Sequence, residues 1–265
     1  MKITLTEIHL PPKFIRGLLP MLCLIALFGG IMGKGSVATA QDADSDLTFE
    51  TPEETITFYM ESLAAGEIPA IMQTLAVDEM SKNFRFDLYV ERLRALNFQA
   101  PAPSDDAFYT EINRAQFLWQ ILFQTRNLTY GLLTTDPALL NGQTIIIDAE
   151  ETTAFATEFI SNMDLERLAQ LQIVTIAIPS PELVQSERNV ENWDRLARIY
   201  GADELTERVV LFVFEGDSYL VGFTLLRYED DWKISSIQSA LGNTSSTGGP
   251  MQITEEEFQE LVGGS

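Results

Sequence analysis

Three short apolar segments, separated by acidic turns, follow one another near the end of this 265-residue sequence. They cover residues 208–214, 219–228 and 232–239, and the turns between them cover 215–218 and 229–231. Segments of this length, rich in β-branched and aromatic residues and bounded by Gly, Asp and Ser, predict β-strands. Consecutive strands joined by such short turns pair side by side, so the sequence predicts an antiparallel meander. The rest of the chain must then cover its faces.

An amphipathic helix is predicted ahead of the meander, from Thr51 onward. Thr51 and Glu54 form a capping box, and Pro52 suits the first helical position. Gly66 is placed to end the helix. Its apolar face repeats at the helical spacing of three and four residues and consists of Ile56, Tyr59, Met60, Leu63 and Ala64.

Periodicity predicts further elements in the middle of the chain. The expected helices cover residues 70–75, 81–97, 104–125, 152–171 and 187–200, and the expected strands cover 143–149, after a tight turn at 141–142, and 173–178. Residues 117–123 are apolar nearly all round, which predicts deep burial.

The first 40 residues have the pattern of an export signal. Lys2, Lys13 and Arg16 precede an uncharged apolar run at 17–33, and small residues end at Ala38 and Ala40. We therefore expect cleavage between Ala40 and Gln41, and export to the cell exterior, the periplasm or the cell surface, with no membrane attachment afterwards. The alternative is an uncleaved membrane anchor.

Removal of residues 1–40 changes the composition in a way that excludes several classes of chemistry. The segment holds both His9 and Cys23, the only residues of their types, with four of the 17 Lys and Arg residues and one of the 39 acidic residues. The remainder has 13 basic and 38 acidic residues, a net charge of −25. Disulfides, a Cys nucleophile, a Ser-His-Asp triad and a His- or Cys-ligated metal site are excluded from it. We expect no cofactor, no metal and no nucleic-acid partner.

Composition also suggests a domain organisation. Residues 41–50 are expected to be a disordered leader, 51–241 a single domain, and 242–265 a flexible linker and a short helix. Phe258, Leu261 and Val262 would share a face of that helix. A helix this short is marginal alone, so it either docks or folds on a partner.

Two of these segments resemble the nuclear-transport-factor-2-like superfamily. The opener Thr51 to Gly66 has the form T-P-E-E-T-x-x-x-Y-x-x-x-L-x-x-G, and Arg227 to Ile237 closes the meander with R-Y-E-D-D-W-K-I-S-S-I. The resemblance implies an α+β fold in which N-terminal helices pack on a bent, cone-like antiparallel sheet. The middle of this chain, about 98–205, is longer than in a usual member, so we expect an enlarged helical middle region or a separate helical subdomain.

The resemblance also implies where an enzyme of this superfamily would carry its base. Such enzymes place an Asp, or an Asp and His pair, inside the cone, and the mature chain has no His. A lone carboxylate remains an option if burial raises its pKa. Asp148, Glu150 and Glu215 are the candidates on predicted strands or their edges, although a strand end or a solvated turn explains each of them. We therefore assign no catalytic residue.

A ligand-binding role has a different set of candidates. On its predicted strand, Arg227 lies on the same side as a row of mostly apolar residues. It would bind a carboxylate ligand at the cavity mouth, unless it forms a strand-end salt bridge. The candidates for pocket lining, which are equally well explained as core, are Tyr59, Tyr89, Trp119 and Trp232.

Binding is the first hypothesis for function. The chain would be a non-enzymatic domain of the cell exterior that binds a small molecule or a protein, with a homodimer as an open option. The second hypothesis is a lyase or isomerase that uses one buried carboxylate. An acidic surface that collects divalent cations is the third.

Overall fold

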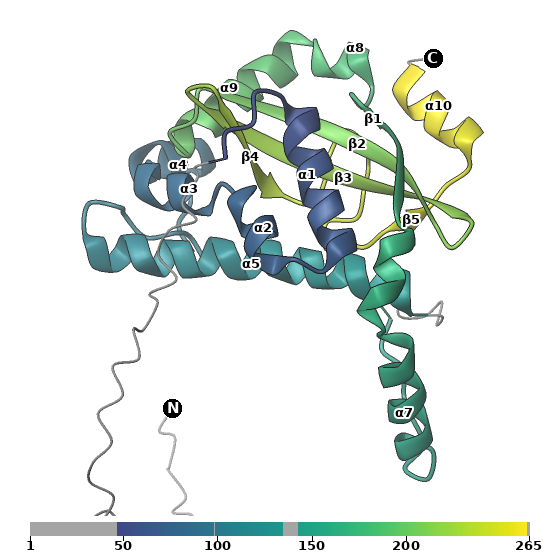
Figure 1. The fold of residues 1–265 in the computed structure, drawn as a ribbon. Helices are drawn as coiled ribbons and strands as arrows, with labels where there is room; N and C mark the ends of the chain where they lie inside the picture. The colour runs from purple at the N-terminus through teal and green to yellow at the C-terminus, as the bar shows by residue number, and fades with distance from the viewer. Residues whose placement is uncertain (1–46, 98, 135–142, 264–265) are drawn as a thin grey trace, which may run out of the picture. The chain divides into compact units, whose positions relative to one another are not determined.

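The predicted meander forms the centre of an antiparallel sheet in the computed structural model, which describes residues 47–97, 99–134 and 143–263. The sheet has five strands in the order β1-β2-β3-β4, and β5 pairs with the beginning of β3 (Figure 1). The strands are β1 (Gln172–Ala177), β2 (Glu204–Phe214), β3 (Asp217–Tyr228), β4 (Asp231–Ser236) and β5 (Met251–Gln252). The meander and the strand predicted at 173–178 are confirmed.

The turn between β2 and β3 fixes the register of the two longest strands. Phe214 pairs with Asp217, so only Glu215 and Gly216 form the loop. Both have positive φ, 51° and 94°, which is the conformation of a two-residue type I′ hairpin. Gly216 adopts it without a steric cost.

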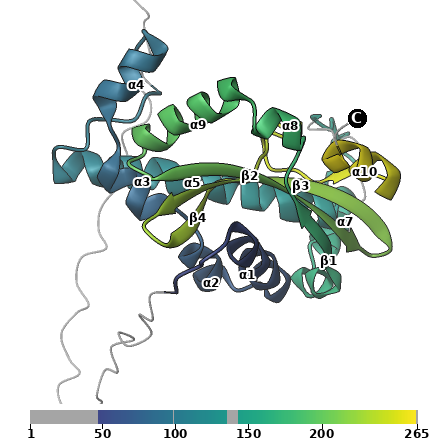
Figure 2. The same ribbon diagram turned by 90° about the horizontal axis from the view of Figure 1, so that it is seen from above.

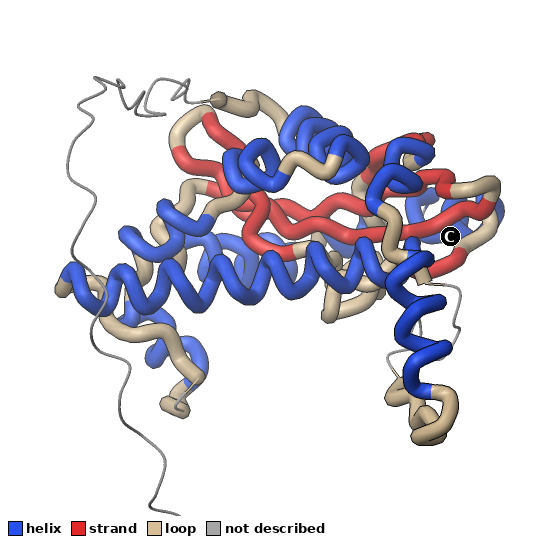
Figure 3. Tube along the Cα trace, turned by 60° about the horizontal axis from the view of Figure 1, so that its bottom comes forward, coloured by secondary structure: helices blue, strands red, loops and turns tan. Residues whose placement is uncertain are grey.

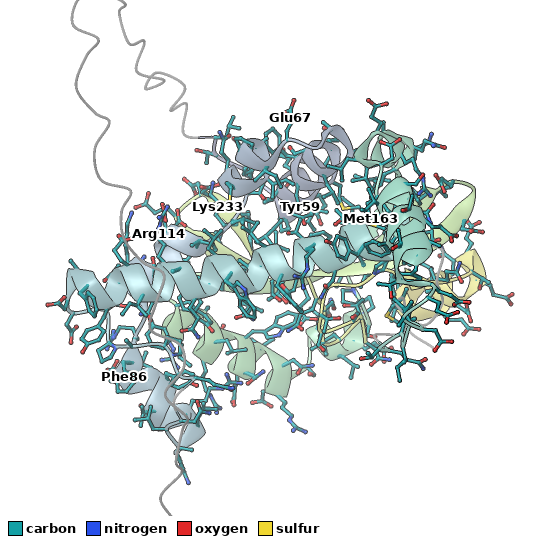
Figure 4. All side chains as sticks on the ribbon, turned by 90° about the horizontal axis from the view of Figure 1, so that it is seen from below. Tyr59, Glu67, Phe86, Arg114, Met163 and Lys233 are labelled. Carbon is teal, nitrogen blue, oxygen red and sulfur yellow. The ribbon has the colours of Figure 1, made fainter. Side chains whose placement is uncertain are left out.

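Helix α1 (Pro52–Ala65) covers one face of the sheet. Thr51 and Glu54 make both hydrogen bonds of the predicted capping box, and Gly66 ends the helix at φ 70°. The buried Tyr59 ring meets the buried Phe223 ring of β3 edge-on, with centroids 5.4 Å apart. Figure 4 shows Tyr59 between α1 and the long helix α5 (Ala107–Leu133). The expected amphipathic opener is confirmed.

Other helices cover the opposite face. Figure 2 shows α8 (Pro181–Val184) and α9 (Glu187–Ile199) on one side of the sheet, and α1 with α2 (Ile68–Gln73) on the other. Helix α10 (Glu255–Gly263) packs through the fully buried Phe258. The Phe258 side chain joins a small apolar cluster with Val209, Leu211 and Leu220. Of the two expectations for this helix, docking is the one observed.

The predicted helix at 81–97 is wrong as a single element. The structure has α3 (Val77–Asn83) and α4 (Phe86–Leu93) with a break between them. The break follows from tertiary contacts, because Phe84 is buried and the Arg85 amide donates to the carbonyl of Ile199. A backbone donor used in this way is not available to continue α3.

The long helix and the segment after it also differ from expectation. α5 continues to Leu133 instead of ending near residue 125. Trp119 is 67% exposed, so the prediction that 117–123 is deeply buried throughout is wrong. The helix predicted at 152–171 is two elements, α7 (Thr152–Asn162) and the 3₁₀ helix η1 (Leu165–Gln170).

The strand predicted at 143–149 is wrong. Residues 143–148 have no regular structure, and the predicted turn at 141–142 lies outside the described residues. No described strand pairs with this segment, since the strand beside β2 is β1, from a later part of the chain. An apolar run without a neighbouring strand has no partner for its backbone groups.

Segment 242–250, expected to be a flexible linker, makes hydrogen bonds through Gly242 and Thr244 to Ser239, and through the carbonyls of Ser246 and Thr247 to α5. The buried Glu207 carboxylate accepts from the Ser239 hydroxyl at 2.6 Å and from the Leu241 amide at 2.9 Å. The Gly242 amide donates to the Ser239 hydroxyl at 2.8 Å. The boundaries expected for the domain and the leader stay predictions.

The predicted fold class is confirmed. The described chain is α+β, with N-terminal helices packed on a curved antiparallel sheet and a middle region enlarged by helices. Among the described residues, no helix combines the length and apolar character that a membrane span requires.

Candidate functional site

A pocket of about 720 Å³ lies beside the C-terminal half of α5. Its walls come from α5, the irregular segment 143–147, α7 and segment 245–251, and we call it the α5–α7 pocket. The residues that line it are Phe123, Asn127, Tyr130, Gly131, Thr134, Gln143, Thr144, Ile145, Ile147, Phe155, Phe159, Ser245, Thr247, Gly249, Pro250 and Met251.

Helix α5 provides one wall of the pocket, and its lining residues recur every three or four positions. Phe123, Asn127, Tyr130, Gly131 and Thr134 therefore lie along one face of the helix. The extension of α5 beyond residue 125 is what places Tyr130 at this wall.

Helix α7 provides the opposite wall and has an unusual environment. It points away from the sheet, and none of its residues is buried (Figure 3). Phe155 and Phe159, four positions apart, stack with ring centroids 6.3 Å apart. Phe159 also meets Tyr130 of α5 edge-on at 5.9 Å. These rings are the apolar contact between α5 and α7 beside the pocket.

Segment 245–251 is fixed against α5 at the third wall. The Gln124 side-chain amide donates to the Ser246 carbonyl at 3.1 Å, and the Asn127 amide donates to the Thr247 carbonyl at 2.9 Å. Gly248 has φ 80°, and a Cβ there would lie 2.6 Å from the Cβ of Gln124. Only glycine allows this close approach.

The chemistry of the lining is apolar and aromatic, with a few neutral polar groups. Among the described residues that line the pocket, none carries a charge. Such a lining binds a ligand through burial of apolar surface and orients it with amide and hydroxyl groups. Within the described ranges, no three His, Cys, Asp or Glu side chains come close enough together to hold a metal ion.

One cation stands next to the pocket. The Arg126 guanidinium lies 4.7 Å from the ring centroid of Phe123 and 5.8 Å from that of Tyr130. Both rings line the pocket. Arg126 does not line the pocket itself, but it is exposed and holds a positive charge beside two of the lining rings, which is the rim of the pocket on this side.

The structure places Tyr59 in the core. Its hydroxyl donates to the Thr125 hydroxyl at 3.0 Å. Burial raises the pKa of Tyr59, opposed in part by that hydrogen bond. Its role as a ligand-binding residue stays a prediction, and in this structure Tyr59 contributes packing.

Tyr89 and Trp119 lie apart from each other. The half-buried Tyr89 ring packs against Phe84 with centroids 5.7 Å apart. Trp119 stacks on Phe123 at 5.4 Å, so it touches a pocket residue without lining the pocket itself.

Arg227 and Trp232 are the two predicted residues that the structure brings together. The Arg227 guanidinium lies 5.8 Å from the Trp232 ring centroid. It also forms an ion pair with Glu204 of the neighbouring strand at 3.1 Å. The salt-bridge alternative holds for Arg227, with Glu204 as the partner. The five predicted ligand-binding residues therefore do not form one site in the described chain.

The predicted carboxylate candidates have surroundings that do not favour a general base. Asp148 and Glu150 are exposed. Glu215 pairs with Arg167 at 2.7 Å, and that hydrogen bond holds the pKa of Glu215 below its ordinary value. Burial instead raises the pKa of Glu79, a carboxylate that the sequence did not single out and that does not line the α5–α7 pocket.

A second cleft of about 540 Å³ lies where α3, α4 and the end of α9 meet. Lys82, Arg85 and Arg198 line it together with Asp105. The Arg85 charge is already paired with Asp87 at 2.8 Å, and all three cations are exposed to solvent. The α5–α7 pocket, with its wall of stacked rings, is the better-formed candidate.

The candidate site residues that sequence reasoning missed are the aromatic residues of this pocket. Phe155 and Phe159 have helical spacing in the sequence. This spacing predicts that both lie on one face of a helix, but it does not predict which part of the chain packs beside that face. Tyr130 lies beyond the predicted end of its helix. The signal that points to the site is an i, i+4 aromatic pair on a helix with few other apolar residues.

Comparisons with known proteins give one structural likeness. No family model matches the sequence, and no curated protein matches it. The chain is similar to the crystal structure of a cystatin-like protein from Ruminococcus gnavus ATCC 29149, with 20% sequence identity and a TM-score of 0.47. The match covers 76% of this chain and 44% of that chain. A likeness of this size says nothing about ligand or activity.

Proposed function

We propose that the chain is an exported, non-enzymatic binding domain whose α5–α7 pocket takes a small, largely apolar ligand. One observation carries the proposal: four aromatic side chains line a pocket of about 720 Å³, and no charged side chain does so among the described residues. Ligand pockets have volumes of roughly 300–1,000 Å³ and are lined mainly by apolar groups with a few polar ones. The neutral polar side chains of Asn127, Thr144 and Ser245 would orient the ligand.

Two other features support binding over catalysis. The sheet face that would line a cone cavity is occupied by the buried pair Tyr59 and Phe223. The candidate base Glu215 is paired with Arg167, whose hydrogen bond lowers the pKa of Glu215 and so makes it a weaker base. A lyase or isomerase remains the alternative, with Glu79 as its carboxylate. Turnover of a ketosteroid or a hydroxy acid by the purified chain, abolished by Glu79→Gln, would contradict the binding proposal.

Membership of the nuclear-transport-factor-2-like superfamily is part of the proposal. It is supported by the capped opening helix and by the closing meander, which lie where that superfamily has them. Homodimers are common among its members, so we include a homodimer as a prediction. Light scattering after gel filtration tests it, and a monomeric mass at high protein concentration would contradict it.

Export is proposed from the sequence pattern of the first 40 residues, which lie outside the described part of the chain. Expression in a secreting host is expected to give a product that begins at Gln41. N-terminal sequencing checks this, and a membrane-bound product that retains Met1 would contradict it.

The experiment that tests the pocket compares two neighbouring residues of α7. The probe is N-phenyl-1-naphthylamine, a neutral dye that becomes fluorescent in apolar sites. We expect Phe159→Ser to weaken its binding to the purified chain about tenfold or more, because the substitution removes one of the four aromatic side chains that would cover the dye, and about 1.4 kcal/mol of lost binding free energy is tenfold in affinity.

Ile160→Ser is the matched control. Ile160 is the next residue of α7, is 73% exposed and does not line the pocket. Its substitution should leave the affinity for the dye within about twofold. Equal effects of both substitutions, or no binding to the unmodified chain, would contradict the proposal.

A further inference from the structure

We propose that Arg126 recognises an anionic group on the ligand of the α5–α7 pocket, so that the ligand is an amphiphile with an apolar body and one carboxylate- or sulfonate-like head. This inference rests on the proposed function, because the pocket supplies the site for the apolar body. It adds the class of ligand and the residue that selects it.

The first argument is the position of Arg126. It lies three residues after Phe123 and four before Tyr130, so all three side chains lie on the same side of α5. The distances of 4.7 Å and 5.8 Å from the guanidinium to the two ring centroids place it within cation–π range of both rings. Cation–π contacts of this kind hold a guanidinium in place. Arg126 is therefore kept beside the rings that form the pocket wall.

The second argument is that Arg126 has no acidic partner among the residues that the structure describes. Seven Lys and Arg residues of the described chain form ion pairs with Asp or Glu, and Arg126 is not one of them. A cation–π contact with a ring leaves the N–H groups of the guanidinium available as hydrogen-bond donors. Those donors match the two oxygens of a carboxylate, or two of the three oxygens of a sulfonate.

The third argument is the charge around the site. Beyond residue 40 the chain has a net charge of −25, so most of its surface repels anions. The described residues that line the α5–α7 pocket contribute no carboxylate of their own. A positive charge at the rim of an uncharged pocket therefore favours an anionic head there, with the apolar body inside.

The test uses two dyes that differ in one group. 1-Anilinonaphthalene-8-sulfonate is N-phenyl-1-naphthylamine with an added sulfonate, so their shared rings report on the pocket and the sulfonate reports on Arg126. We expect Arg126→Gln to weaken binding of the sulfonate dye about fivefold, the scale of a solvent-exposed ion pair. The same substitution should leave the neutral dye within about twofold. Arg126→Lys, which keeps the charge, should restore part of the affinity.

Arg188→Gln is the matched control, because Arg188 is an exposed cation of α9 that does not line the pocket and has no ion pair in the described chain. It should change neither affinity. If both dyes bind and Arg126→Gln weakens both equally or neither, the inference is wrong and the pocket proposal stands. Binding of the neutral dye alone also overturns the inference. If neither dye binds, the proposed function fails and the inference fails with it.

Discussion

Helices α1 and α7 have similar lengths and both carry apolar residues at helical spacing, yet the structure uses them in opposite ways. α1 has 14 residues, a capping box and seven buried residues. α7 has 11 residues, no side-chain cap and no buried residue. α1 faces the sheet, whereas α7 points away from it (Figures 1 and 3). Apolar residues at helical spacing therefore form core in α1, which packs on the sheet, and one wall of a pocket in α7, which does not.

The largest expected effect comes from the same substitution made in both helices. Ile56 of α1 is fully buried, and Ile160 of α7 is 73% exposed. Ile56→Ala should lower the free energy of unfolding by about 2–5 kcal/mol, because it leaves a cavity in the core. Ile160→Ala should change it by less than about 0.5 kcal/mol. Urea unfolding measures both, and comparable losses would show that α7 is packed as firmly as α1.

A smaller difference is expected at the first turns of the two helices. The Thr51 hydroxyl accepts from the Glu54 amide at 3.2 Å, whereas Glu151 makes no side-chain hydrogen bond at the start of α7. Thr51→Ala should lower the free energy of unfolding by about 1 kcal/mol. Glu151→Ala should have little effect in the same urea titration. A loss at Glu151 that matches the loss at Thr51 would mean that α7 is capped after all.

The smallest effect concerns the ion pair that anchors the end of α7. Arg167 donates to both carboxylate oxygens of Glu215, each at 2.7 Å, and also to the Asn162 carbonyl at the end of α7. Arg167 keeps the pKa of Glu215 below its ordinary value of 4.5. The ionised carboxylate therefore stabilises the folded chain above pH 4.5, and this contribution is lost as the pH falls through the lowered pKa.

Glu215→Gln should accordingly lower the melting temperature by a small amount at pH 7, and the difference from the unmodified chain should shrink as the pH falls below 4.5. Asp217→Asn, in the same hairpin and without an ion pair in the described chain, is the control and should show no such trend. A difference that stays constant with pH would show that the Glu215 charge is not responsible.

Local signals in the sequence were sufficient for the three-stranded meander and for α1, the helix that packs on it. The meander alternates apolar strands with acidic turns, and the first helix has its cap, its apolar face and its terminating glycine within 16 residues, from Thr51 to Gly66. Features such as these depend on neighbours in the sequence. They predict structure because the backbone N–H and C=O groups need hydrogen-bond partners and the apolar faces need burial, and a helix or a sheet provides both.

The elements that were predicted wrongly depend on contacts between residues that are far apart in the sequence. The break between α3 and α4 follows from the Arg85 amide donating to the Ile199 carbonyl, more than 100 residues away in the sequence. The apolar run at 145–147 has the composition of a strand but has no strand beside it. The pocket residues could not be identified for the same reason, since Phe123 and Phe159 come from helices whose approach no local pattern reveals.

The most direct test of the central claim is a crystal structure of the chain with bound N-phenyl-1-naphthylamine. The account predicts density for the dye between α5 and α7, in contact with Tyr130 and Phe159, with Tyr59 and Phe223 still packed against each other. Density for the dye at the sheet face beneath α1, with the α5–α7 pocket empty, would contradict it.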